Sequence, residues 1–153
     1  MSEVDEFLEA VLPRQVAAEI EVHNGNVGPR LAMWSHNDPV TVFGTWRLNS
    51  GWEGVSDAIS NVASTFSDCK SYEFEVHAAG ASGDLAYTVG FEPTTCSVNG
   101  VEQTYTLRVT NIYRREDGEW KLVHRHADRK TEMNSTTGGL PESATTVGYG
   151  KPA

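Results

Sequence analysis

The sequence predicts an α+β fold in which helices from the first half of the chain lie on one face of a curved antiparallel sheet formed by the second half. Apolar residues recur every three or four positions over 4–22 and 54–66, which is helical spacing. After residue 71 the period changes to two, as in half-buried strands. Because the helices precede the strands, we expect them to be segregated on one side of the sheet and to enclose a pocket there.

The first helix is predicted over residues 4–22, with Ser2 as its cap. Pro13 falls inside the pattern and lacks a backbone donor, so we expect a kink there or two abutting helices. A second, short helix is predicted from Pro29 to Trp34, ended by residues 35–39. A short strand over 40–43, a loop containing Trp46 and a third helix over 54–66 follow.

Four antiparallel strands are predicted in the second half of the chain. They begin at Tyr72 and continue over 85–95, 105–115 and 120–127. The dipeptides Asn99-Gly100 and Asp117-Gly118 are strong signals for two-residue hairpin turns. Residues 129–153 are rich in Thr, Ser, Gly and Pro, which predicts one domain over 1–128 and a flexible tail over 129–153.

Charge and cysteine content exclude several classes of protein. The net charge of −9 argues against nucleic acid and anionic membranes as partners. The acidic start of the chain is unlike a signal peptide, and no apolar run approaches the roughly 18 residues of a membrane span. Cys69 and Cys96 show no metal or disulfide spacing, so we expect inert thiols in a cytoplasmic protein.

Three segments resemble one family. They are WSHNDPVTVFG from Trp34 to Gly44, GDLAYTVG from Gly83 to Gly90, and LRVTNIYRREDGEWKLVHRHAD from Leu107 to Asp128. Together they look like the SnoaL-like, ketosteroid-isomerase-related branch of the NTF2-like superfamily. The resemblance implies a cone made of a curved antiparallel sheet wrapped around about three N-terminal helices, with an internal pocket. It also implies a homodimer through the outer face of the sheet.

The chain departs from the isomerases of that superfamily at the catalytic positions. Those enzymes carry an aspartate base just after the first strand and a tyrosine on the first helix. Here Phe43 and Gly44 follow the strand, Asp38 precedes it, and the first helix has no tyrosine. The resemblance therefore implies the fold more strongly than the reaction.

Pairing the last hairpin about its turn predicts which side chains share a face. Arg108, Thr110 and Arg125 fall together, and the resemblance implies that Arg108 points into the pocket. We therefore expect these three, with Thr106, to line it. His124 and His126 would then face a dimer partner.

A register shifted by one residue gives the opposite result. His124 and His126 would point inward beside Arg108, forming a basic site that binds a carboxylate or enolate and moves a proton. Two histidines at this spacing also suit a metal, but no third ligand is evident. We predict neither a metal nor a cofactor.

The remaining candidates each have a functional and a structural interpretation. Trp34 and Trp46 would stack on a ligand or belong to the core, and Tyr87 would form part of an aromatic wall or pack on the sheet. His36 with Asp38 suits either a base with its orienting acid or an ordinary turn before a proline.

Two functions follow from these patterns. The first is a protein that binds a small hydrophobic or acidic organic ligand, acting as an acid/base enzyme of isomerase, cyclase or hydrolase type on a polyketide-like or steroid-like compound. The second is a non-catalytic dimerisation or accessory module whose pocket is vestigial or holds an anion. An open cavity favours the first, and a cavity filled by Trp34, Trp46 and Tyr87, with Arg108 in an ion pair, favours the second.

Overall fold

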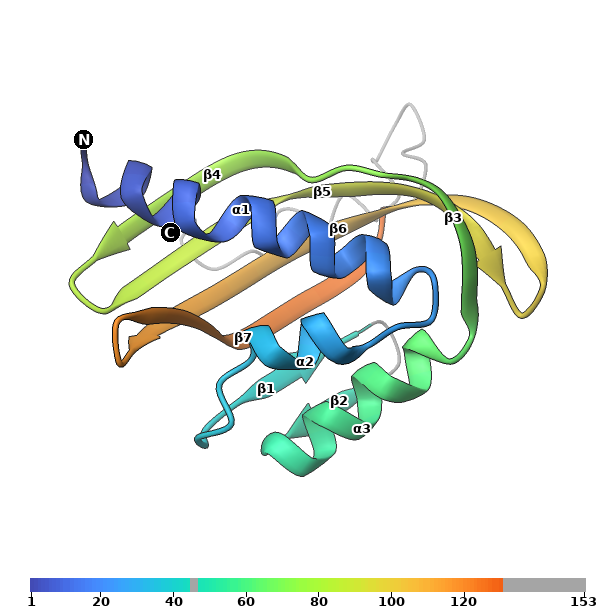
Figure 1. Ribbon diagram of the computed structural model, residues 1–153, viewed down its shortest axis with the longest axis horizontal. Helices are drawn as coiled ribbons and strands as arrows, with labels where there is room; N and C mark the ends of the chain where they lie inside the picture. The colour runs from blue at the N-terminus through green and yellow to red at the C-terminus, as the bar shows by residue number, and fades with distance from the viewer. Residues whose placement is uncertain (45–46, 131–153) are drawn as a thin grey trace, which may run out of the picture.

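Three helices cover one face of a single curved sheet (Figure 1). The computed structural model describes residues 1–44 and 47–130, so Trp46 and residues 131–153 of the predicted tail lie outside the described residues. The helices are α1 (Glu3–Val22), α2 (Gly28–Met33) and α3 (Trp52–Ala63). None of the helices described here is long and apolar enough to cross a membrane.

The sheet is mixed but mostly antiparallel, which agrees with the predicted α+β class. Its strands follow the order β2-β1-β7-β6-β5-β3, and β4 also pairs with β5. Only β1 and β7 are parallel among the described pairs. The strands are β1 (Thr41–Phe43), β2 (Leu48–Ser50), β3 (Phe66–Tyr72), β4 (Glu75–Ser82), β5 (Leu85–Val98), β6 (Val101–Glu116) and β7 (Glu119–Arg129).

Helix α1 begins as predicted but is not interrupted. The Ser2 hydroxyl accepts a hydrogen bond from the Asp5 amide at 3.2 Å, completing a capping box. The alternative of two abutting helices at Pro13 is wrong, because α1 continues through it to Val22 as one helix. Pro13 and Glu9, whose carbonyl loses its helical donor, both lie on the exposed side of the helix, where an unpaired carbonyl costs little.

Both predicted hairpin turns are present. Asn99 and Gly100, and likewise Asp117 and Gly118, have positive φ angles between 51° and 81°, as the tight turns that suit twisted strands require. They join β5 to β6 and β6 to β7.

The sheet contains more strands than the sequence predicts. Leu48–Ser50 forms the edge strand β2 where a loop was expected. The predicted strand around Tyr72 is two strands, β3 and β4, which pair with opposite ends of the long β5. Strand β7 ends at Arg129, one residue beyond the predicted boundary at residue 128.

A β-bulge in β7 changes the predicted register. Tyr113 pairs with Leu122, as expected, but the next pair is Ile112 with His124, so Val123 is an extra residue. After Val123, each side chain of β7 therefore lies on the face of the sheet opposite to the one it would occupy without the bulge. Arg125 consequently pairs with Asn111 on the helix side, whereas Arg108 and Thr110 face the other side.

The core lies between α1 and the sheet at the end nearer the chain's N-terminus. The ring of Phe7 meets the edges of Tyr113 and Trp120 at centroid distances of 5.2 and 5.1 Å. Trp34 and Leu122 complete this cluster, almost fully buried. The apolar core fills that end and leaves the other end for a cavity.

Candidate functional site

A cavity of about 220 Å³ lies between the helices and the sheet. All three helices and strands β1, β2, β3, β6 and β7 contribute to it. Its apolar wall consists of Val22, Val42, Phe43, Ala58, Ile59, Val62, Phe66, Leu107 and Ala127. The polar lining consists of Glu19, His23, Arg30, Arg47, Asn49, Tyr105 and Arg125.

An ion pair between Glu92 and Arg125 closes the floor. Arg125 donates to both carboxylate oxygens, at 2.9 and 2.7 Å, and Gln15 donates to one of them at 3.2 Å. Glu92 is fully buried. Burial raises its pKa, but the charge and hydrogen bonds of Arg125 outweigh this, so the pKa of Glu92 lies below its ordinary value. The negative charge of Glu92 and the positive charge of Arg125 therefore cancel at the floor of the cavity.

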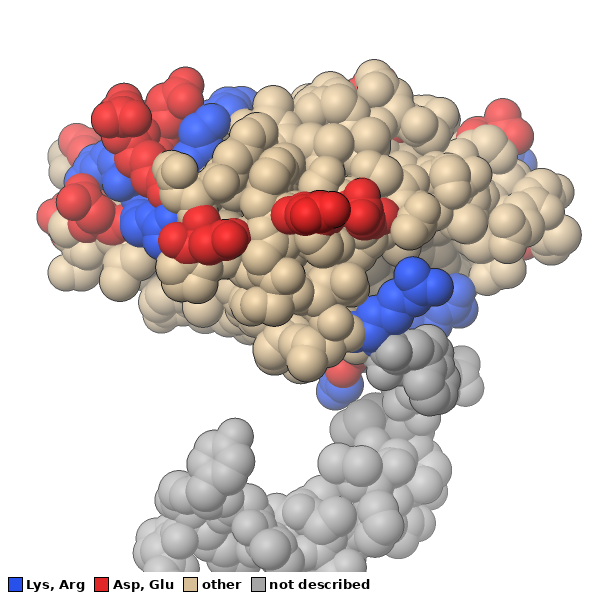
Figure 2. Space-filling view, turned by 90° about the horizontal axis from the view of Figure 1, so that it is seen from below, with Lys and Arg blue, Asp and Glu red and all other residues tan. Residues whose placement is uncertain are grey.

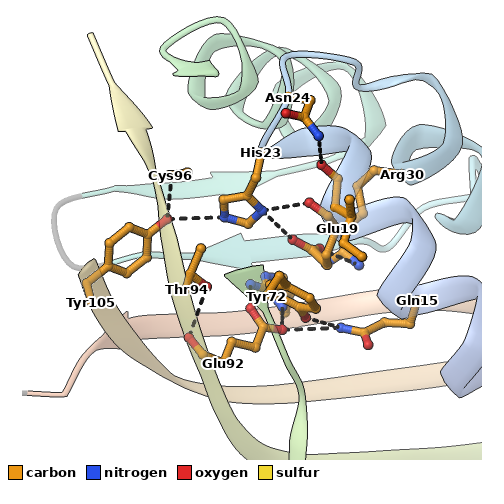
Figure 3. Close-up of polar contacts among 12 residues, drawn as sticks. Gln15, Glu19, His23, Asn24, Arg30, Tyr72, Glu92, Thr94, Cys96 and Tyr105 are labelled. Carbon is orange, nitrogen blue, oxygen red and sulfur yellow. Dashed lines mark hydrogen bonds and ion pairs between the residues drawn. The ribbon is translucent and has the colours of Figure 1, made fainter. Parts of the chain in front are cut away.

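A second acid and base pair lies on the helix side of the cavity. Glu19 projects from α1, and its Oε1 lies 2.8 Å from Nη1 of Arg30 on α2. Both side chains are buried. The other oxygen of Glu19, Oε2, lies 3.9 Å from Nδ1 of His23. One carboxylate thus bridges a guanidinium and an imidazole (Figure 3).

The imidazole of His23 is held at both nitrogens. Nδ1 lies 2.6 Å from the backbone carbonyl of Glu19, and Nε2 lies 3.1 Å from the hydroxyl of Tyr105 (Figure 3). A carbonyl only accepts, so Nδ1 carries the proton and Nε2 accepts from Tyr105. The ring stacks on Phe66 at 4.7 Å. Neighbouring groups thus fix both the position and the tautomer of the His23 ring.

Burial keeps the tyrosine hydroxyls around this site protonated. It raises the pKa of Tyr105 and of Tyr72 well above the ordinary value of 10.0. The Tyr105 hydroxyl therefore has a proton to donate to His23. His23 and Tyr105 form a pair able to take up and pass on a proton at the cavity wall.

The sequence-predicted ligand residues are divided between two faces. Arg125 lines the cavity. The expectation that Arg108 and Thr110 join it there is wrong: on β6 they alternate with the buried Val109, Asn111 and Tyr113 and so lie on the outer face of the sheet, whereas the bulge in β7 turns Arg125 to the inner face. Arg108 and Thr110 line a hollow of about 410 Å³ on the outer face, together with His126 and Asp128. Arg108 donates to both oxygens of Asp128 at 2.7 Å.

The two candidate histidines of β7 do not enter the cavity. Nδ1 of His124 lies 2.7 Å from the hydroxyl of Thr41, and His126 borders the outer hollow. The interpretation that His124 and His126 point into the cavity beside Arg108 is therefore wrong. The two histidines and Arg108 do share one face, but it is the outer face of the sheet.

The aromatic and loop candidates also lie away from the cavity. Trp34 belongs to the buried core, and Tyr87 is exposed on the outer face, its ring over Gly80. His36 stacks on Trp52 at 3.9 Å, and Asp38 accepts from the backbone N–H of Trp52 at 2.9 Å. Asp38 thus caps α3. Within the described residues, no three His, Cys, Asp or Glu side chains are close enough together to hold a metal ion.

Sequence reasoning missed most of the polar lining. Gln15 and Glu19 on α1 and His23, the residue that caps its C-terminus, follow one another at intervals of four and continue the buried stripe of Phe7 and Val11. This run of polar residues within an apolar stripe was the available signal, because such residues are buried only with partners. Arg30 and Glu92 offered no comparable pattern.

The fold and site together define an α+β protein whose helices and curved sheet surround a partly open, partly charged cavity. A model of the SnoaL-like domain matches residues 17–127, and the chain belongs to that family. Its fold is NTF2-like by comparison with solved structures. No curated protein matches the chain significantly.

Two solved structures illustrate the likeness of fold. One is a proposed dehydratase of the NTF2-like family from Streptomyces avermitilis, 19% identical, with a TM-score of 0.66 over 82% of this chain and 96% of that one. The other is a ketosteroid isomerase-like protein from Erwinia carotovora atroseptica SCRI1043, 14% identical, with a TM-score of 0.67 over 82% and 98%.

Proposed function

We propose that this protein binds a small organic molecule in the inner cavity and transfers a proton from it, with His23 as the base. The observation that carries the proposal is the orientation of His23. Its Nε2 accepts from Tyr105 at 3.1 Å while Nδ1 is fixed by the backbone of Glu19 at 2.6 Å. An oriented imidazole at the wall of an apolar cavity suits general base catalysis.

The proton moves along the hydrogen bond that is already formed. As Tyr105 accepts a proton from the ligand, it passes its own hydroxyl proton to Nε2 of His23, leaving an anionic ligand and an imidazolium. The Glu19 carboxylate, 3.9 Å from Nδ1, stabilises that cation. The apolar wall excludes water and strengthens these interactions.

This step suits two of the three reaction types that the sequence suggests. Isomerases and many cyclases begin by removing a proton next to a carbonyl group, and the polyketide-like or steroid-like ligand expected from the sequence offers such protons. Two neighbours of the same fold are named as a ketosteroid isomerase-like protein and a proposed dehydratase. Those names are compatible with proton transfer here.

The opening of 5-nitrobenzisoxazole tests the base directly. In that reaction a base removes one C–H proton, the N–O bond breaks, and a coloured phenolate forms. We expect saturable catalysis that falls at least about 100-fold in His23→Gln. His36→Gln, at an exposed histidine that does not line the cavity, is the matched control and retains the rate. Equal rates in His23→Gln and the unaltered protein would reject the proposal.

We also propose that two copies associate through the outer face of the sheet. Leu85, Tyr87, Val89 and Ile112 are exposed there, and Tyr87 pairs with Ile112 across β5 and β6. Apolar side chains gathered on one face favour a protein partner. Figure 2 shows another face, on which the charged side chains at one end are of both signs and much of the remaining surface is uncharged. A non-catalytic dimerisation module would need this outer surface but not His23.

A further inference from the structure

We infer that the ligand of the inner cavity is a small organic acid of one or two rings, whose anionic oxygens bind Arg30. The inference rests on the ligand-binding cavity of the proposed function, but not on its proton transfer. It follows from an unsatisfied guanidinium, the charge of the lining and the size of the cavity.

The guanidinium of Arg30 has donors without acceptors. It reaches the cavity from α2 and is 2% exposed. Its Nη1 lies 2.8 Å from Glu19, but neither Nη1 nor Nη2 makes a well-directed hydrogen bond within the described residues. Buried N–H donors are costly when unpaired, so an acceptor that enters the cavity would bind there.

The charge of the lining selects an anion. Three arginines line the cavity, at positions 30, 47 and 125, against the single carboxylate of Glu19. Glu92, behind the floor, neutralises Arg125. Because Glu19 pairs with Arg30, the excess positive charge of the lining is carried by Arg47, whose side chain is exposed, and it is opposite in sign to the net charge of −9 of the whole chain. A carboxylate completes this balance, and a cationic ligand would increase the imbalance.

The volume limits the size of the acid. A dry cavity of roughly 150 Å³ holds one benzene molecule. A cavity of about 220 Å³ therefore takes a substituted ring or two fused rings, and a four-ring steroid exceeds it. This narrows the polyketide-like or steroid-like class expected from the sequence to its smaller members.

Arg30 also lies next to the proton-transfer pair. Arg30 contacts Oε1 of Glu19, and His23 contacts Oε2 of the same carboxylate. An acid group bound at Arg30 therefore brings the neighbouring carbon atoms of the ligand toward His23 and Tyr105. The structure combines an anion-binding group and a base on one wall.

Binding of three matched single-ring probes tests the charge requirement. Benzoate, benzamide and benzylammonium have nearly the same shape and differ in charge. By titration calorimetry, with the His23 ring signals followed by NMR, we expect benzoate to bind at least about tenfold more tightly than benzamide. Benzylammonium should not bind. Equal affinity for benzoate and benzamide would overturn the inference.

Variants test the role of Arg30. Arg30→Gln leaves Glu19 unpaired, so the double variant Glu19→Gln/Arg30→Gln is made as well to keep the site neutral. Both should weaken benzoate binding at least about tenfold. Arg108→Gln, which removes an arginine from the outer face, is the matched control and leaves the Kd unchanged. Unchanged binding in the double variant would assign the anion to another group and refute the inference.

A size series and the catalytic assay separate the remaining outcomes. We expect 1-naphthoate to bind and lithocholate, a four-ring acid, to bind more weakly; tighter lithocholate binding would refute the size limit. If benzoate binds through Arg30 while His23→Gln leaves nitrobenzisoxazole opening unchanged, the inference stands and the proposed catalysis falls. The reverse result rejects the inference alone.

Discussion

Glu92 and Arg125, 33 positions apart in the chain, form a two-bonded ion pair beneath the cavity, with N–O distances of 2.9 and 2.7 Å. Glu92 comes from β5 and Arg125 from β7, on either side of β6. The pair therefore joins two strands that do not themselves share backbone hydrogen bonds.

Removing one partner of this pair should be strongly destabilising. Glu92→Gln leaves the Arg125 guanidinium buried without a counter-charge, at a cost of about 3 kcal/mol or more in the free energy of unfolding. Replacing both by methionine should recover most of that loss. Urea denaturation measures both effects. Asp128→Asn breaks the more exposed pair with Arg108 and should cost less than about 1 kcal/mol. An equal loss in Glu92→Gln and Asp128→Asn would contradict this prediction.

His124 should make stability depend on pH near neutrality. Burial lowers its pKa below 6.5, His126 acts in the same direction, and the contact with Thr41 opposes them. Its neutral form is thus favoured in the folded state, so this stability is present above pH 6.5 and is lost as pH falls through the lowered pKa. NMR titration of the ring should give a midpoint below 6.5. His124→Gln should flatten the pH dependence, and a midpoint at or above 6.5 would contradict the prediction.

The proposed dimer should dissociate when charge is placed on its apolar surface. Ile112 is exposed on the outer face beside Tyr87. Ile112→Glu places a charge within the proposed contact on each copy, so we expect the mass measured by light scattering to halve while circular dichroism stays unchanged. Ile20→Glu, at an equally exposed apolar residue of α1, is the control. A monomer before substitution would reject the dimer.

Gly90 should not tolerate a side chain. A Cβ atom built there would lie 2.0 Å from the backbone oxygen of Glu75, next to the irregular pairing of β4 with β5. Gly90→Ala should therefore destabilise the fold by about 1–3 kcal/mol. Gly54→Ala, inside α3 with no contact closer than 3.8 Å, should instead stabilise it by up to about 1 kcal/mol. Thermal unfolding of both variants measures the difference.

Local patterns were sufficient for most of the fold. The stripe of α1, the turn at Asp117-Gly118 and the alternation along β5 each depend on neighbouring residues, which the sequence displays directly. The edge strand β2 was missed because its three residues have no pattern of their own and pair only through β1.

The site was harder to predict because its groups meet only after folding. Glu19 and Arg30 come from different helices, and Glu92 meets Arg125 across an intervening strand. Their pairing is decided by tertiary packing, which no spacing in the sequence records. Arg125 was predicted to face the pocket, and it does so through a bulge that the hairpin pairing did not include.

The bulge at Val123 behaves like a one-residue insertion in the last strand. A relative without it would carry its inward-facing arginine one position earlier in the chain. Aligning that relative to this sequence without a gap would match its arginine to His124, a residue of the opposite face. Deleting Val123 should therefore straighten the strand and leave Arg125 inside. Strand alternation alone would predict that losing one residue turns every following side chain to the other face, whereas losing the bulge residue keeps the inner side chains inside.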